Sequence, residues 1–170
     1  MTAQNLLTRV AVFIILRNNK GQILMHQRAN TGYLDGYYDL SCSGHVDAGE
    51  SIQEAAVREL AEEIGITADP QDLKLVHIYQ AFIDTPYLNF TFLLDSWQGT
   101  SEIKEPNKCS NLAYFDADNL PERCTLGVRV NERAGFGCEL SYSKITKESL
   151  QQEWPDLYAE LHERLTKADA

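Results

Sequence analysis

The chain has 170 residues, 44% of them hydrophobic, which suits one globular domain with its own core. Its formal net charge is -10, so the surface repels nucleic-acid polymers and anionic membranes. These values argue against a polymer-binding or membrane-binding function and favour a small-molecule ligand. A polyanionic ligand would have to be met by local cations or by bound metal.

No internal repeat, low-complexity stretch or linker divides the sequence, so we expect one domain over residues 1–170, as a monomer or homodimer. The N-terminal residues MTAQNLLTRV lack the basic start and apolar stretch of a signal peptide. The cysteines form no CxxC pair and show no metal-ligand spacing with the histidines. We therefore expect reduced thiols, a cytoplasmic location and no zinc site.

The N-terminal segment is predicted to begin with a buried strand at residues 9–16, because β-branched and aromatic side chains run through it. Residues 18–21 have the composition of a turn, and residues 22–27 are predicted to return as the partner strand of a hairpin. Residues 29–39 are rich in Gly, Tyr, Asp and Asn. They are expected to form a loop that walls a ligand cleft.

A helix is predicted next, beginning after Ser51 and ending at Gly65. Ser51 and Glu54 have the spacing of a capping box, and Gly65 followed by an apolar residue is a favourable αL stop. One face of the helix is apolar and is expected to pack on the core. That face comprises Ala56, Val57, Leu60, Ala61 and Ile64.

Three glutamates share the other face of this helix, where stability alone would not place them. Glu62 and Glu63 follow Glu59 by three and four residues, spacings at which helical side chains are neighbours. Such like-charge pairs cost an isolated helix about 0.2–0.5 kcal/mol each, and Arg58 offsets only part of this. Crowded carboxylate oxygens are what Mg²⁺ or Mn²⁺ requires. Glu59, Glu62 and Glu63 are therefore predicted to bind a divalent metal.

Further strands are predicted at residues 73–83 and 87–97, joined at Asp84-Thr85-Pro86, and at residues 112–115. Residues 121–148 carry mixed signals that permit no assignment. A helix is expected at about residues 150–167 from an apolar stripe at helical spacing. Pro155 is expected to open the main helix at its first turn, with Trp154 just outside it.

The run GHVDAGESIQEAAVRELAEEIGI at residues 44–66 resembles the complete signature of the Nudix hydrolases. The flanking segments NTGYLDGYYDL and EPNKCSNLAYFDADNLP resemble the MutT-like nucleotide pyrophosphatases of that family. The resemblance implies an α/β (α+β) fold, a Nudix-type α/β/α sandwich with a mixed β-sheet between helices. It also implies hydrolysis of a nucleoside diphosphate linked to another moiety.

The resemblance assigns roles within the signature. Glu59, Glu62 and Glu63 are implied metal ligands, together with the backbone carbonyl of Gly44. Glu50 and Arg58 are implied to brace the loop and the helix against each other.

Outside the signature, the resemblance favours Glu105 as a further metal ligand, with Glu102 as its rival. Arg28 has a guanidinium that could bind a substrate phosphate, although an exposed salt bridge would explain it equally well. The aromatic side chains with a possible stacking role towards a base are Tyr33, Tyr37, Tyr38 and Tyr87. Of these, Tyr33 is the candidate retained for the substrate site.

The chemistry of a phosphoanhydride is consistent with this metal site. The anion repels hydroxide, so attack at phosphorus needs divalent cations that neutralise oxygens, acidify water and stabilise the departing phosphate. We expect a Mg²⁺-dependent hydrolase, with Mn²⁺ as the alternative metal. Its most favoured reaction is the conversion of a nucleoside triphosphate to monophosphate and pyrophosphate, an oxidised purine nucleotide being one candidate substrate. Spacing alone does not identify the glutamate that acts as general base.

Two alternative functions are weighed against this expectation. Isopentenyl-diphosphate isomerases share the fold, and Cys42 near His45 is similar to their catalytic cysteine, although the spacing differs. The stretch Leu40-Ser41-Cys42-Ser43 also departs from the proline that many Nudix proteins carry before Gly44. The second alternative is a non-catalytic nucleotide-sensing module, which would be expected to lose metal glutamates; all three are present.

Overall fold

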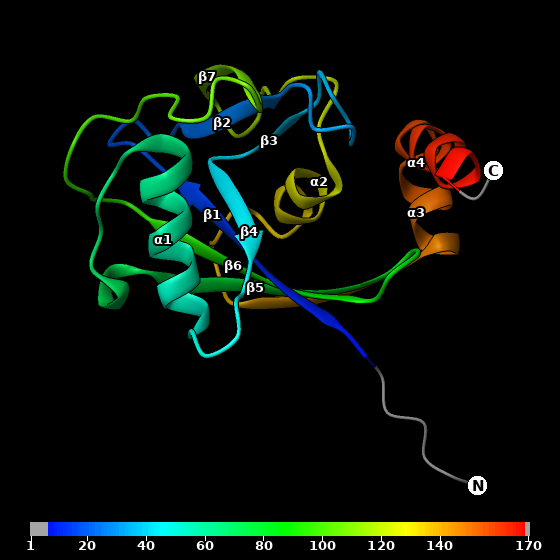
Figure 1. The fold of residues 1–170 in the computed structure, drawn as a ribbon, viewed down its shortest axis with the longest axis horizontal. Helices are drawn as coiled ribbons and strands as arrows, with labels where there is room; N and C mark the ends of the chain where they lie inside the picture. Colours follow the sequence, from blue (N-terminus) through cyan, green and yellow to red (C-terminus); the bar gives the residue numbers. More distant parts are fainter. Residues whose placement is uncertain (1–6, 169–170) are drawn as a thin grey trace, which may run out of the picture.

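The computed structural model describes residues 7–168, with side chains in the last helix described as far as residue 163. Its centre is a mixed five-stranded sheet in the order β4-β1-β6-β5-β8. β1 runs parallel to β6 and β5 runs parallel to β8, whereas the other two pairings are antiparallel. Figure 1 shows α1 and α2 on either side of this sheet. The strands are β1 (Arg9–Leu16), β4 (Cys42–His45), β5 (Lys74–Phe82), β6 (Tyr87–Leu94) and β8 (Ser141–Thr146).

β1 is apolar on both faces because both faces of the sheet are covered. Val12, Ile14 and Leu16 pack into the core formed with helix α1 (Ile52–Ile64). Phe13 and Ile15 point the opposite way, towards the clusters that include helix α2 (Leu126–Arg133). The continuous apolar run in the sequence is the pattern expected of a strand buried on both sides.

A second, antiparallel sheet has the order β3-β2-β7, with β3 (Tyr38–Leu40), β2 (Ile23–Arg28) and β7 (Cys109–Phe115). The prediction that residues 9–16 and 22–27 pair as a hairpin is therefore wrong. Beside the turn, the isolated bridge between Arg17 and Ile23 and the hydrogen bond from Asn18 N–H to the Gln22 carbonyl do not extend into a ladder. The turn at residues 18–21 forms, but it carries the chain into another sheet because β1 already has β4 and β6 as partners.

Helix α1 has the predicted ends. The Ser51 side chain accepts from the Glu54 N–H, the Glu54 side chain accepts from the Ser51 N–H, and Gly65 takes the αL conformation at φ 71°. The predicted buried face is corrected at one position. Ala61 is exposed and Ala55 is buried in its place, because the side of α1 that packs on the core carries Ala55, Ala56, Leu60 and Ile64.

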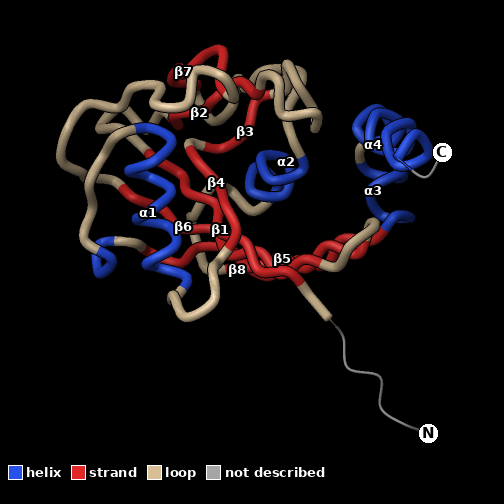
Figure 2. The backbone as a smooth tube through the Cα atoms, viewed as in Figure 1, coloured by secondary structure: helices blue, strands red, loops and turns tan. Residues whose placement is uncertain are grey.

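The region from residue 121 to 148, which the sequence left unassigned, contains α2 and β8. The expected C-terminal helix is two helices, α3 (Lys147–Glu153) and α4 (Pro155–Ala168). Thus residues 150–153 belong to a separate helix, which is a correction. Pro155 opens α4 with Trp154 just outside it, as expected. Figure 2 shows both helices beyond the end of β8.

The strand boundaries also differ from the sequence-based ones. β6 ends at Leu94 rather than at residue 97, and β7 begins at Cys109, earlier than residue 112. The hairpin of β5 and β6 across residues 84–86 is confirmed, and the short 3-10 helix η1 (Pro70–Asp72) precedes β5.

Within residues 7–168, no helix is long and apolar enough to cross a membrane.

Candidate active site

The end of β4 places Gly44 directly against the acidic face of α1. A Cβ atom built on Gly44 would lie 1.9 Å from Glu59 Oε1 and 2.1 Å from its Cδ, so only glycine fits while this carboxylate stays in place. The Glu59 side chain is only 12% exposed, whereas that of Glu62 is 58% exposed. The predicted face therefore has a buried inner carboxylate beside the β4 loop and an outer carboxylate in solvent.

Arg58 ties this loop and α1 together, as the predicted bracing role requires. Its Nη2 donates to Glu50 Oε1 at 2.8 Å and to the His45 carbonyl at 3.0 Å. Its Nη1 donates to Glu59 Oε1 at 2.6 Å and to Glu62 Oε2 at 3.3 Å. The hydrogen bond to Glu50, followed by that to Glu59, raises the pKa of Arg58, and the bond from Arg58 is the main cause that lowers the pKa of Glu50. One guanidinium thus offsets more of the acidic repulsion than helix spacing alone suggests.

Glu63 is more buried than Glu59, its neighbour on the acidic face of α1. Among the hydrogen bonds and ion pairs of the described residues, Glu63 has no cationic partner. Its Oε2 accepts one hydrogen bond, from the Ser43 N–H at 3.2 Å. Burial, followed by the charges of Glu59, Glu105 and Asp39, raises the pKa of Glu63 to about 8. Burial is also the main cause that raises the pKa of Glu59, with Glu62 and Glu105 adding to it and Arg58 opposing it.

The structure separates the two candidates for an additional carboxylate. Glu105 is close enough to raise the pKa of both Glu59 and Glu63, and its Oε1 accepts from Lys108 Nζ at 2.7 Å. Glu102 instead pairs with Lys104 at 2.5 Å, and its side chain is 63% exposed. The backbone of the intervening loop donates to the end of α1, where Lys104 N–H meets the Glu63 carbonyl at 2.9 Å. This contact holds the loop that carries Glu105 beside the helix.

Within residues 7–168, no three His, Cys, Asp or Glu side chains are arranged to hold a metal ion as they stand. Arg58 pairs with Glu59 and Glu62, and Lys108 pairs with Glu105. The residues nevertheless fit a divalent cation in their chemistry. They are hard oxygen donors, and burying Glu63 beside other carboxylates is costly without a counter-charge.

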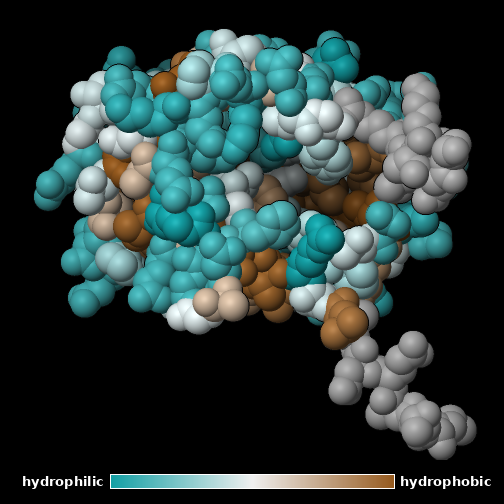
Figure 3. All heavy atoms as spheres, viewed as in Figure 1, coloured by the Kyte–Doolittle hydropathy of each residue, from teal (hydrophilic) through white to brown (hydrophobic). Residues whose placement is uncertain are grey.

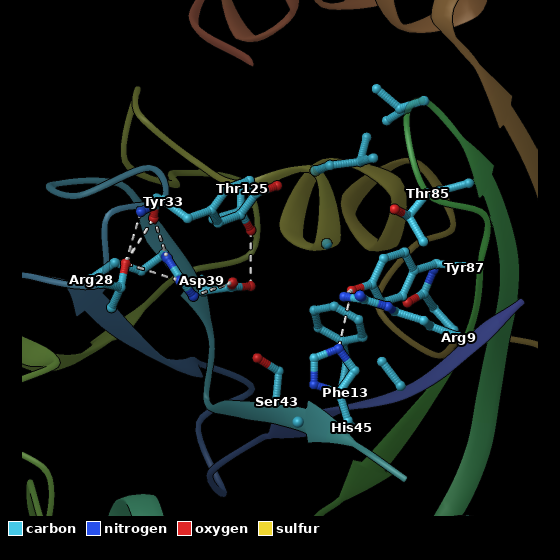
Figure 4. Close-up of a pocket in the computed structure, with 18 of the residues that line it drawn as sticks. Arg9, Phe13, Arg28, Tyr33, Asp39, Ser43, His45, Thr85, Tyr87 and Thr125 are labelled. Carbon is cyan, nitrogen blue, oxygen red and sulfur yellow. Dashed lines mark hydrogen bonds and ion pairs between the residues drawn. The ribbon is translucent and has the colours of Figure 1, made fainter. Parts of the chain in front are cut away.

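A cavity of about 600 Å³ opens from the Gly44 and Glu63 end and runs across the sheet. Figure 3 shows apolar side chains at the bottom of a hollow between α2 and the C-terminal helices. In Figure 4, Arg28, Asp39 and Thr125 lie on one side of this cavity, and Arg9, His45 and Tyr87 lie on the other. The volume suits a small-molecule ligand such as a nucleotide.

Arg28 lines this cavity and is held by several partners. Its Nη1 lies 3.6 Å from Asp39 Oδ2, its Nε donates to the Tyr33 carbonyl at 2.9 Å, and the guanidinium lies over the Tyr33 ring. Asp39 is 4% exposed and also accepts from the Thr125 hydroxyl at 2.8 Å. Arg28 is therefore in a largely buried ion pair rather than an exposed one, at a point where it also faces the cavity.

The four tyrosines considered for stacking fall into two groups. Tyr33 and Tyr87 line the cavity. Tyr37 is buried under the Arg123 guanidinium, 4.5 Å from its ring centroid, and Tyr38 packs edge-on against Phe115. Tyr37 and Tyr38 are thus explained by packing.

Several cavity residues were missed by sequence reasoning. They are Phe13, Asp39, Tyr79, Asn89 and Lys108. Asn89 offered a usable signal, because an amide in the apolar run YLNFTFLL has to be buried at a cost. The others lie in segments whose convergence depends on the tertiary fold.

Cys42 does not support the isomerase alternative. It is fully buried in the cluster that packs on α1, so it faces away from the cavity that His45 lines. Burial is the main cause that raises the pKa of the Cys42 thiol well above its usual range. A thiol so placed cannot protonate or deprotonate a ligand in the cavity.

Comparison with known proteins adds a family to this geometry. The NUDIX domain family model matches residues 7–131. The 8-oxo-dGTP diphosphatase of Escherichia coli (strain K12) is 31% identical over 110 residues, which cover 63% of this chain and 83% of that protein. The phosphatase NudJ of the same strain is 45% identical over 53 residues, covering 31% of this chain and 35% of that protein.

Solved structures agree on the fold. The MutT NUDIX hydrolase from Burkholderia pseudomallei has a TM-score of 0.69 at 24% identity, covering 75% of this chain and 98% of that one. A mutator MutT protein from Bacillus halodurans has a TM-score of 0.66 at 22% identity, covering 81% and 89%. At these identities the likeness concerns the arrangement of sheet and helices.

Proposed function

This chain belongs to the Nudix family as a MutT-like hydrolase of nucleotide derivatives, and from that premise we propose that it is a magnesium-dependent nucleoside triphosphate pyrophosphohydrolase. The products would be a nucleoside monophosphate and pyrophosphate. The observation that carries the proposal is the meeting of Gly44, Glu59 and Glu63 at one end of a nucleotide-sized cavity. The relative named 8-oxo-dGTP diphosphatase adds support for a nucleoside triphosphate as the class of substrate.

The proposed metal ligands are Glu59, Glu62, Glu63 and Glu105 with the Gly44 carbonyl. Members of the family generally depend on a divalent metal, and Mg²⁺ or Mn²⁺ suits an all-oxygen donor set. When bound, the metal would neutralise phosphate oxygens and acidify the attacking water. We propose that Arg58 and Glu50 keep Glu59 beside the Gly44 loop through the hydrogen bonds described above.

The remaining cavity residues would bind and orient the nucleotide. Lys108, which pairs with Glu105 beside the signature, and Arg28 are cations of the lining that would meet phosphate oxygens, and Tyr33 and Tyr87 offer ring faces for a base. Glu63, which is protonated at neutral pH when no cation faces it, can release its proton when one does. The chain is proposed to work as one domain, because α3 and α4 contribute to the cluster beneath the cavity. A cytoplasmic location stays a prediction.

The test is an assay of the full chain with Mg²⁺ on nucleoside triphosphates, dinucleotides, nucleotide sugars and ADP-ribose. Products are resolved by chromatography, and the expected products are monophosphate and pyrophosphate from one or more triphosphates. If the chain cleaves only dinucleotides, nucleotide sugars or ADP-ribose, it is a phosphoanhydride hydrolase but nucleoside triphosphates are not its substrates. If it cleaves none of these compounds, hydrolysis is rejected and a nucleotide-sensing module is favoured.

A further inference from the structure

Asn89 lies in the middle of β6, on the sheet face that forms the floor of the cavity. Its neighbours across the sheet are Ala11 on β1 and Tyr79 on β5, and all three residues line the cavity. Asn89 is only 3% exposed. A buried amide in a central strand is unfavourable unless its polar atoms are satisfied or used by a ligand.

The two polar atoms of the Asn89 amide have different surroundings. Nδ2 donates to the Tyr79 carbonyl at 3.3 Å. Oδ1 accepts no hydrogen bond in the described part of the chain. Across residues 7–168, the polar side-chain atoms sealed from solvent without a partner are His77 Nε2 and Asn131 Oδ1. Asn89 Oδ1 is unpaired but not sealed, so its free surface opens into the cavity that Asn89 lines.

We propose that Asn89 is a specificity-determining residue whose Oδ1 accepts a hydrogen bond from the exocyclic amino group of a nucleobase. The inference rests on the proposed function, because it assumes that a nucleotide occupies the cavity. It assigns the chain a preference for 6-aminopurine or 4-aminopyrimidine nucleotides over their oxo counterparts. An oxo group would put a carbonyl oxygen against Oδ1, and two acceptors repel each other and leave both unpaired.

The amide cannot simply turn over to accept an oxo base. A flip would place Oδ1 against the Tyr79 carbonyl oxygen and remove the hydrogen bond that Nδ2 now makes. The carboxylate of Asp39 also lines this cavity, but the Leu40 N–H, the Thr125 hydroxyl and the Arg28 guanidinium already face it. Asn89 Oδ1 is therefore the acceptor through which the floor favours a ligand edge that carries N–H donors.

The position of Asn89 suits the base of a nucleotide whose phosphates lie at the signature. β4, β1 and β6 are consecutive strands, so Asn89 lies two inter-strand spacings from the strand of Gly44, roughly 10 Å. Gly44, Glu63 and Asn89 line the same cavity. Phe13 of β1 and Tyr87 of β6 supply aromatic faces on that floor, where a base can stack.

The test compares two nucleotide pairs that differ by an amino group and an oxo group, CTP with UTP and ATP with ITP. With the full chain and Mg²⁺, kcat/KM is expected to favour the amino member of at least one pair by about tenfold or more. In Asn89→Leu that ratio is expected to fall to within about twofold, with little loss on the oxo member. The matched control is Thr91→Val, two residues along β6, because Thr91 is buried and bonds Asn131 rather than facing the cavity.

A binding measurement keeps the proposal testable without catalysis and if Asn89→Leu does not fold. Calorimetric titration of the wild-type chain in EDTA compares CMP with UMP and AMP with IMP, and tighter binding of an amino member by about tenfold is expected. Equal affinities within both pairs, or an unchanged kcat/KM ratio in a folded Asn89→Leu, would overturn the role of Asn89. Failure to hydrolyse any nucleotide would reject the proposed function, while the monophosphate affinities would still decide whether Asn89 reads the base.

Discussion

Replacing Glu63 by glutamine is expected to stabilise the metal-free protein at high pH while abolishing most of its activity. Burial, with the charges of Glu59, Glu105 and Asp39, holds the pKa of Glu63 at about 8, compared with 4.5 for an ordinary glutamate. At neutral pH the metal-free chain therefore folds with Glu63 protonated. Glutamine has nearly the shape of that neutral form and cannot ionise.

The sign follows from linkage between folding and protonation. Because the folded-state pKa lies above the unfolded value of 4.5, the proton on Glu63 stabilises the fold fully below pH 4.5. This stabilisation is lost as the pH rises through about 8. The difference between the two pKa values corresponds to at most about 5 kcal/mol in the free energy of unfolding. About 3 kcal/mol of this is lost between about pH 6 and about pH 9.

Urea denaturation in EDTA at these two pH values, followed by circular dichroism, measures the effect. The free energy of unfolding of the wild type should fall by up to about 3 kcal/mol more than that of Glu63→Gln. Glu62→Gln is the matched control, because the exposed Glu62 side chain pairs with Arg58 and its replacement should leave the wild-type pH dependence intact. Both variants should lose several orders of magnitude in turnover with Mg²⁺. The reasoning is refuted if Glu63→Gln shows the same pH dependence as the wild type.

Three further substitutions, the last with Glu102→Gln as its control, probe the rest of the site. Gly44→Ala should force the Glu59 carboxylate away from the β4 loop, and turnover should fall at least about tenfold with little change in melting temperature. If the variant turns over like the wild type, Glu59 can move without loss of activity. Arg58→Lys keeps the charge but loses the forked guanidinium that joins Glu50, Glu59 and the loop. Urea denaturation should show a decrease of about 1–3 kcal/mol in the free energy of unfolding, and an unchanged midpoint would contradict the bracing role. Glu105→Gln should weaken Mn²⁺ binding in a calorimetric titration whereas Glu102→Gln should not, and equal affinities in the two variants would remove Glu105 from the site.

The acidic helix could be predicted closely because the information that defines it is local. The capping box of Ser51 and Glu54 and the αL glycine at 65 fix its ends within a few residues of sequence. The helix periodicity also placed Glu59, Glu62 and Glu63 on one side. Ala61 was misplaced because Ala55 and Ala61 lie at opposite borders of the apolar stripe, and only tertiary packing determines which of them is buried.

Strand pairing and the cavity could not be predicted in the same way. The turn after β1 looks like a hairpin turn, but both edges of β1 are already paired, with β4 and β6 from later parts of the sequence. β2 pairs with β3 and β7 in the other sheet. Likewise, Asp39 and Asn89 become cavity residues only when two sheets meet. A single sequence carries little local signal for such contacts.

The ion pairs of Arg58 and Lys108 have a consequence for the proposed metal site. A divalent ion at Glu62 or Glu105 would compete with a cation that is covalently part of the chain, and such competition weakens the apparent affinity for the ion. Arg58 would still donate to Glu50 and to the His45 carbonyl, so the bracing of the loop would survive that competition.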